Sequence, residues 1–263
     1  MVGQLHVFLT SIFVLNRLAS CKYTQIGNKL YADFRGQNLT SAPDIFTNVT
    51  NIDLSNNHLT EFDLTLHYPK LNTIWLNNNK LTRIPDLRQG GTVTYCYLGG
   101  NHIAFQGEEL IGLVKVYVIY WQDSGLLTFP DGNVTGLLWG LHIDRNLLTS
   151  VPKLVNFGEN IMWFTLNGNK IANLNSSDLA PYRHISYLHL TDNPLLSVSD
   201  FCMWDGRSGL HEGFKMELDF RYMNCDCSLA WTKFWRYGTV KGLCPNGRKL
   251  AEMNLSDLGC LGK

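Results

Sequence analysis

The sequence predicts an α/β-type solenoid, a right-handed, curved coil of short turns with a parallel sheet along its concave side. Three observations lead to this prediction. One motif recurs seven times at a nearly constant interval, apolar and solvent-facing positions alternate within each copy, and all copies but one carry an asparagine at the same place. Self-similarity at intervals of roughly 20 to 50 residues is the signature of stacked repeats.

The recurring motif reads L-x-x-L-x-L-x-x-N-x-L, with other apolar residues in some of the leucine positions. In the first copy these positions are Val49, Ile52, Leu54, Asn57 and Leu59. The seven copies begin 22 to 24 residues apart, at Val49, Leu71, Val93, Val116, Leu138, Ile161 and Ile185. Chance does not produce seven such copies in register, so each copy is one structural unit.

The spacing inside each copy predicts how the units stack. The fourth and sixth motif positions alternate with solvent-facing neighbours, as in a short strand with one buried face. One unit cannot bury its apolar edge alone, so neighbouring units stack into a coil with a continuous core. The asparagine turns the chain inward, where its amide can bond backbone groups at the bend. Ser124 replaces it in the fourth copy, which predicts a looser fourth turn.

These motifs resemble the leucine-rich-repeat family, over about Leu30 to Cys260. The resemblance implies a curved horseshoe with a parallel concave sheet, a scaffold that many proteins use for binding. Together with the apolar start of the chain, it predicts a signal peptide at 1–20, a degenerate N-terminal cap at 21–48, seven repeats at 49–212, and a cap at 213–263. That last part combines a half-repeat with a cysteine-rich C-terminal flanking module.

The beginning of the chain predicts secretion. Leu5 to Leu15 is an apolar run too short to span a bilayer, and the small residues Ala19 and Ser20 follow it. The alternative for this run is a buried N-terminal strand. No later stretch is apolar enough for a membrane helix, and three residues after Cys260 leave no room for an anchor. Five N-x-S/T sequons predict a glycosylated surface, at Asn38, Asn48, Asn133, Asn175 and Asn254.

The N-terminal cap departs from the family. Phe34 stands where the flank of the family carries a cysteine, and only Cys21 remains nearby. We therefore expect packing of Phe34 and Leu39 to close this end. Cys96 fills an inward position of the third repeat and predicts a buried thiol. Cys202 either pairs within the C-terminal cap or stays free, and the surrounding segment 199–213 is long enough to reach the binding face.

The C-terminal segment carries four further cysteines, and sequence alone allows three pairings among them. The alternative is a zinc site built from the same four residues. The resemblance to the cysteine-rich flanking module implies disulfides that join Cys225 to Cys244 and Cys227 to Cys260. Leu229, Trp231, Phe234 and Trp235 are expected to form one apolar helix face over the last repeat.

The candidate site lies on the solvent-facing positions of the strands. These positions do not contribute to the core, yet they carry a contiguous set of aromatic residues, and exposed clusters of that kind mark contact sites. Asp123, Asp144, Arg145 and Asp192 could supply a polar margin. The predicted ligand-binding residues are Trp75, Tyr95, Tyr97, Tyr117, Tyr120, Trp139, His142, Trp163, Tyr187 and His189, with Met162 beside them. The alternative is that the rings pack on one another and only stiffen the sheet.

The function predicted from these features is extracellular recognition of a protein ligand, or of a cell-surface or matrix glycoprotein, as in innate-immune or cell-adhesion proteins. Equal numbers of basic and acidic residues, 22 of each, argue against nucleic acid or an anionic membrane as partner. No spacing indicates a catalytic site, a metal site or a cofactor. A structural matrix component that binds collagen or proteoglycan is the alternative, and a hydrolase is the remote one.

Overall fold

The computed structural model describes most of the chain between residues 22 and 260. The described ranges are 22–43, 48–64, 68–88, 93–104, 112–113, 115–129, 137–154, 160–182, 184–198, 214–218, 220–234 and 238–260. Several predictions concern residues outside them, namely the signal peptide at 1–20, Cys21, the Asn133 sequon, Cys202 with segment 199–213, and Trp235. Within the described part of the chain, no helix has the length and apolarity to cross a membrane.

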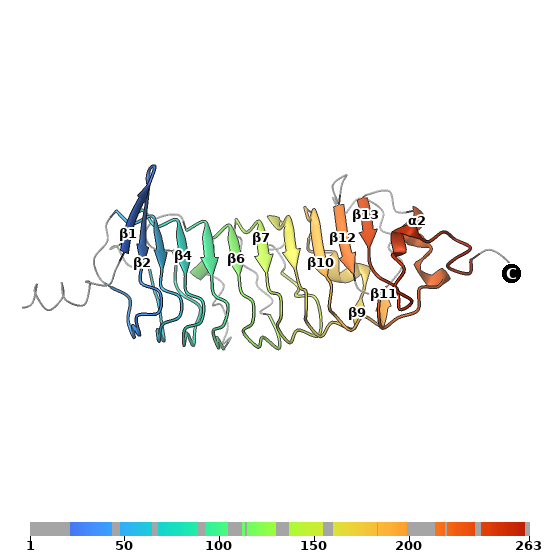
Figure 1. Cartoon of the computed structure of the whole chain (residues 1–263), viewed down its shortest axis with the longest axis horizontal. Coiled ribbons are helices and arrows are strands. Elements are labelled where there is room, and N and C mark those ends of the chain that lie inside the picture. The colour runs from blue at the N-terminus through green and yellow to red at the C-terminus, as the bar shows by residue number, and fades with distance from the viewer. Residues whose placement is uncertain are drawn as a thin grey trace, which may run out of the picture.

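The fold is a solenoid with one continuous main sheet along its length (Figure 1). It begins with an antiparallel hairpin of β1 (Lys22–Ile26) and β2 (Lys29–Asp33), and every later strand pairs in parallel with its neighbours. The strands of the seven repeats are β3 (Asn51–Asp53), β4 (Thr73–Trp75), β5 (Tyr95–Tyr97), β6 (Val118–Tyr120), β7 (Gly140–His142), β8 (Trp163–Thr165) and β10 (Tyr187–Leu190). The prediction of one parallel strand per repeat is thereby confirmed.

Two strands of the C-terminal part extend this sheet, and they are β12 (Phe214–Leu218) and β13 (Gly238–Lys241). A second, small parallel sheet is made of β9 (Asn173–Leu174) and β11 (Ser197–Val198). The described helices are short. They are the 3-10 helices η3 (Ser176–Leu179), η4 (Cys227–Leu229) and η5 (Leu250–Glu252), and the α-helix α2 (Trp231–Phe234).

The core follows from the register of the strands. The middle residue of each strand lies beside the middle residue of the next, so Ile52 pairs with Ile74 and Ile74 with Cys96. This column is fully buried, and it comprises Ile52, Ile74, Cys96, Ile119, Leu141, Phe164, Leu188 and Met216. Cys96 is a free buried thiol, as predicted, and burial raises its pKa above the ordinary value.

The motif asparagines join each turn of the coil to the preceding one. In the fifth repeat, Asn146 Nδ2 donates to Ile143 O of its own turn at 3.0 Å and to Trp121 O of the previous turn at 2.9 Å. Its Oδ1 accepts from the backbone N–H groups of Ser124 and Leu126, at 3.0 and 3.2 Å. The same type of bridge is made by Asn57, Asn79, Asn101, Asn169 and Asn193.

Ser124 is too short to make this bridge in the fourth repeat. Its hydroxyl donates to Gln122 O of the same turn at 3.0 Å. The side-chain bridge of the fourth turn therefore comes from Asn146 of the following turn, and not from Ser124. This makes Asn146 unusually important for the stack.

Hydrophobic packing closes the N-terminal end. Phe34, directly after the hairpin, is 1% exposed, and its N–H donates to Asp53 O at 2.8 Å. Leu39 is partly buried against the core, and its N–H donates to Asn57 Oδ1 at 3.0 Å. The first motif asparagine thus ties the cap to the first repeat.

Two disulfides close the C-terminal end, Cys225–Cys244 and Cys227–Cys260, with Cα–Cα distances of 5.8 and 5.0 Å. This is the pairing that the resemblance implies, and it excludes the zinc alternative for these cysteines. Leu229 and Trp231 are buried, as an apolar helix face requires. Phe234 is not, because 61% of its surface is exposed, so the prediction was wrong for that residue. The described residues of helix α2 are Trp231–Phe234.

Candidate functional site: the open face of the sheet

One face of the main sheet packs on the core, and we call the other one the open face. In each repeat, the strand residues on either side of the buried middle residue point to the open face, since side chains alternate along a strand. Parallel register places equivalent residues side by side, as in the pairs Trp75–Tyr97, Tyr97–Tyr120 and Tyr120–His142. The repeat therefore produces columns of side chains that run along the coil.

One of these columns is a stack of rings that we call the aromatic ladder, and its members are Trp75, Tyr97, Tyr120 and His142. The ring centroids of Trp75 and Tyr97 lie 5.4 Å apart, those of Tyr97 and Tyr120 lie 4.4 Å apart, and those of Tyr120 and His142 lie 4.5 Å apart. All three pairs are stacked, with interplanar angles of 16°, 2° and 5°. The two tyrosine rings thus have both faces covered, so a ligand meets their edges and hydroxyls.

The phenols of the ladder are held in the neutral form. Burial, together with the neighbouring Tyr120 and Tyr95, raises the pKa of Tyr97 to about 12. Burial and Tyr95 also raise the pKa of Tyr120. Both hydroxyls therefore keep their protons at neutral pH and can donate as well as accept hydrogen bonds.

Beside the ladder, two tryptophans stand farther into solvent. Trp139 is 53% exposed and Trp163 is 50% exposed. Each makes only an edge contact, Trp139 with Tyr117 at 5.8 Å and Trp163 with Tyr187 at 6.1 Å between ring centroids. Tyr95 and Met162 are also exposed. These four side chains offer apolar surface that the fold itself does not bury.

His142 ends the ladder in a hydrogen-bonded group. Its Nδ1 lies 3.0 Å from Thr165 Oγ1, which donates to Asp144 Oδ2 at 2.7 Å. Asp144 Oδ1 also accepts from the backbone N–H of Asn167. Burial lowers the pKa of His142 and nearby His189 lowers it further, while Asp144 raises it in part. At neutral pH, His142 is therefore an uncharged ring in the stack.

This pKa predicts a stability that depends on pH. As the pH falls from 7.5 to 5, His142 takes up a proton more readily in the unfolded chain than in the folded one, so the folded state loses stability. We expect His142→Phe, which keeps a stacked ring, to show a smaller fall in Tm between pH 7.5 and pH 5 than the natural chain. Thermal unfolding followed by circular dichroism at both pH values measures this, and equal falls would contradict it.

The predicted polar margin lies along the turn that follows each strand. Arg145 forms a bidentate ion pair with Asp123, with contacts of 2.8 and 2.7 Å. Arg145 also has a φ of 51°, in a column where the other repeats carry asparagine, aspartate or glycine. Such a backbone is unfavourable for arginine and is tolerated where the surroundings compensate. The ion pair with Asp123 supplies such a compensation and presents both charges beside the open face.

At the C-terminal end of the open face, the columns become charged, which the sequence analysis missed. Lys215 lies over the ring of Tyr187, with Nζ 5.1 Å from the centroid. His189 Nδ1 lies 3.8 Å from Glu217, and Glu217 lies 3.6 Å from Lys241 Nζ. Lys215 and Glu217 belong to β12, in the half-repeat, and Lys241 belongs to β13, where the repeat motif no longer marks which positions face outward.

Eight of the ten predicted ligand-binding residues thus lie in strands of the open face, whereas Tyr117 and Trp139 directly precede β6 and β7. The ten residues are also unequal in exposure. The ladder residues cover one another, whereas Trp139, Trp163 and Tyr95 remain accessible. The interpretation that the rings only stiffen the sheet describes the ladder better than it describes the two tryptophans.

Comparisons with known proteins agree with this architecture. A family model described as "Leucine Rich repeats (2 copies)" matches residues 47–89. Ras guanine nucleotide exchange factor V of Dictyostelium discoideum is 31% identical over 155 residues, which are 57% of this chain and 7% of that protein. The crystal structure of human 5T4 (Wnt-activated inhibitory factor 1, trophoblast glycoprotein) superposes with a TM-score of 0.68 and 18% identity, over 91% of this chain and 98% of that one.

These matches are informative about the fold. The chain spans only a small part of the Dictyostelium protein, and an identity of 18% with human 5T4 supports a shared architecture alone. Together with the repeats, the parallel sheet and the two disulfides, they establish that the chain folds as a leucine-rich-repeat solenoid with a disulfide-bonded C-terminal cap.

Proposed function

We propose that this chain is a secreted recognition module that binds a protein ligand through the open face. The observation that carries the proposal is the set of accessible aromatic side chains in the strands of that face and directly before them, with Trp163 and Trp139 half exposed. Large aromatic side chains that the fold leaves uncovered are the usual anchors of protein interfaces. A solenoid of this family is typically a binding scaffold, which agrees with a module that binds and does not catalyse.

The size of the open face supports a macromolecular ligand. The aromatic residues extend from β4 to β10, across six parallel strands spaced about 4.8 Å apart. A surface of this length can supply about 800 Å² per partner, as a specific protein interface requires. The stacked ladder favours binding further, because rings that are already ordered lose little side-chain entropy when a ligand docks.

The proposed location outside the cell has two supports. The disulfides Cys225–Cys244 and Cys227–Cys260 are stable in oxidising compartments, and such bonds are rare in reducing ones. The four sequon asparagines in the described ranges are all exposed, and they are Asn38, Asn48, Asn175 and Asn254. Asn48, Asn175 and Asn254 lie outside the sheet, so glycans there would leave the open face accessible.

Affinity capture tests this function. We expect the glycosylated chain to bind a cell-surface ectodomain from a panel that also contains collagen and proteoglycan. The triple variant Trp75→Ala, Tyr97→Ala, Tyr120→Ala should then bind on the order of 30-fold more weakly, since a lost hot spot costs about 2 kcal/mol.

The control is the pair Leu127→Ser and Leu147→Ser, which replaces exposed leucines outside the strands. This pair should bind normally. Binding of collagen or proteoglycan alone would support a structural matrix component instead. A captured ectodomain whose affinity is the same for the natural chain, for the ladder variant and for Trp139→Ser with Trp163→Ser would place the site away from the open face.

A further inference from the structure

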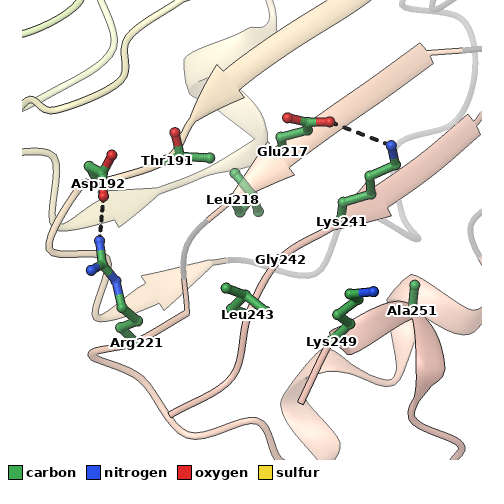
Figure 2. A pocket seen from close by; sticks show the side chains of 10 residues that line it. All are labelled: Thr191, Asp192, Glu217, Leu218, Arg221, Lys241, Gly242, Leu243, Lys249 and Ala251. Atoms are coloured by element: carbon green, nitrogen blue, oxygen red, sulfur yellow. Dashed lines mark hydrogen bonds and ion pairs between the residues drawn. The ribbon is translucent and has the colours of Figure 1, made fainter. Parts of the chain in front are cut away.

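A cavity of about 670 Å³ lies where the last strands of the sheet meet the C-terminal cap (Figure 2). Thr191 and Asp192 line it directly after β10, and Glu217 and Lys241 line it from the ends of β12 and β13. Ala251, on η5, lines the side toward the cap. Its volume is in the range of about 300 to 1,000 Å³ that is typical of ligand sites.

The floor of the cavity is apolar and closely packed. Leu218, Gly242 and Leu243 line it, and about half of the surface of Leu243 is exposed. A Cβ at residue 242 would lie 2.4 Å from a ring carbon of Phe220 and 2.6 Å from Leu218 O, so only glycine fits there. Leu243 follows Gly242 directly, and its half-exposed side chain can contact an apolar side chain in the cavity.

The rim carries an excess of positive charge. Three basic residues line the cavity, against the two carboxylates of Asp192 and Glu217. Arg221 is held tightly by Asp192, with an N–O distance of 2.5 Å. Lys241 and Lys249 lie on the same side of the cavity as Ala251 (Figure 2). Their side chains are 60% and 67% exposed, and their ion pairs with Glu217 and Glu252 are 3.6 and 3.2 Å long.

Exposed ion pairs of this kind contribute little, so the two ammonium groups can turn toward a carboxylate in the cavity. A ligand that places an anion near Lys241 and Lys249 gains two charge-assisted contacts. The apolar floor beside them lies within reach of the same ligand. The two ammonium groups and the apolar lining therefore favour a ligand that carries an acidic group next to an apolar one.

The cavity is continuous with the open face. Glu217 and Lys241 stand in the same column as His189, because β10 pairs with β12 and β12 with β13 in register. A protein that lies along the sheet can reach the cavity without leaving the surface. An extended segment of such a protein would follow this column into the cavity.

We propose that the cavity binds a peptide segment of the protein ligand in which an aliphatic or aromatic side chain is followed by an acidic one. The apolar side chain contacts Leu218, Leu243 and Ala251, and the carboxylate lies between Lys241 and Lys249. The statement that the segment belongs to a protein ligand rests on the proposed function. The chemistry of the site can be tested without that ligand.

The test uses three blocked peptides and methyl NMR of the full chain, with labelled leucine and alanine methyl groups. The peptides are acetyl-Gly-Leu-Glu-Gly-amide, the same peptide with Gln for Glu, and the same peptide with Ser for Leu. We expect the first to shift the methyl signals of Leu218, Leu243 and Ala251, and the other two to bind about tenfold more weakly. The double variant Lys241→Gln, Lys249→Gln should remove the preference for Glu over Gln.

The matched control is Lys80→Gln with Lys170→Gln, two exposed lysines of the repeats, which should keep the preference. Equal affinity for the Glu and Gln peptides, or shifts at other methyl groups, would overturn the proposal. So would inorganic sulfate binding there as tightly as the first peptide, since this would indicate a simple anion site. Trp139→Ser with Trp163→Ser should leave peptide binding in the cavity unchanged. A wrong proposal for the cavity can therefore be distinguished from a wrong proposal for the open face.

Discussion

Replacing Trp139 and Trp163 together by serine is expected to weaken binding of the proposed protein ligand at least 100-fold. About half of each indole is exposed, so a ligand that covers the open face buries a large apolar surface on both. A central tryptophan commonly contributes about 2 kcal/mol or more to an interface. Two such losses would exceed 100-fold even if they are not fully additive.

The same substitutions should leave the fold intact. Each indole makes one edge contact with a tyrosine, worth about 1 kcal/mol, and neither lies in the core column. Surface plasmon resonance with the captured partner measures the affinity, and circular dichroism verifies the fold. Leu127→Ser with Leu147→Ser removes comparable exposed apolar surface elsewhere and should bind normally. Binding within threefold of the natural chain would show that the two tryptophans are not anchors.

The sequence predicts the strands and the core because repetition leaves little freedom. Once copies of 22 to 24 residues stack, Ile52, Ile74 and Cys96 must lie side by side, and the residues between them must face outward. The columns of the open face follow from the same register. A buried thiol at Cys96 and a shared face for the ladder were therefore predictable from spacing alone.

Exposure within those columns was not predictable, because it depends on each ring's neighbours. Trp163 pairs in register with Gly140 and Tyr187. Since Gly140 has no side chain, one side of the Trp163 indole has no stacking partner in its column. Tyr120, in contrast, lies between Tyr97 and His142 and is covered on both sides. Periodicity assigns both rings to the open face but does not distinguish an accessible ring from a stacked one.

The C-terminal cavity was also not predictable, because the repeat ends before it. Strand β13 and helix η5 carry no motif positions, and the Cys225–Cys244 disulfide ties the segment between them to the end of the sheet. This arrangement brings Lys241 and Lys249 to one rim. The exposure of Phe234 was not predictable for the same reason, since no repeated pattern defines which residues of α2 face the core.

Asn146→Leu is expected to lower the free energy of unfolding by on the order of 4 kcal/mol or more. The substitution removes five hydrogen bonds at a buried position, to the carbonyls of Trp121, Ile143 and Asp144 and the N–H groups of Ser124 and Leu126. Each buried backbone group left without a partner costs about 1 to 3 kcal/mol. The loss approaches the total stability of many domains.

The fourth repeat explains why Asn146 contributes more to the stability of the stack than the other motif asparagines. Ser124 bonds within its own turn, so Asn146 provides the side-chain bridge between the fourth and fifth turns. We expect Ser124→Asn to have the opposite effect and to stabilise the chain by about 1 kcal/mol. An asparagine there can reach Leu98 O and the N–H of Ile103, the groups that correspond to those bridged by Asn79 and Asn101.

Urea unfolding followed by circular dichroism measures both changes, and hydrogen exchange locates them. Because repeats interact mainly with their neighbours, Asn146→Leu should speed exchange first in β6 and β7 and leave β3 and β4 protected. If the free energy of unfolding of Asn146→Leu lay within 1 kcal/mol of that of the natural chain, water or a backbone shift would have replaced the bridge. If Ser124→Asn also failed to stabilise, the asparagine column would be dispensable, and the stack would depend on the apolar core alone.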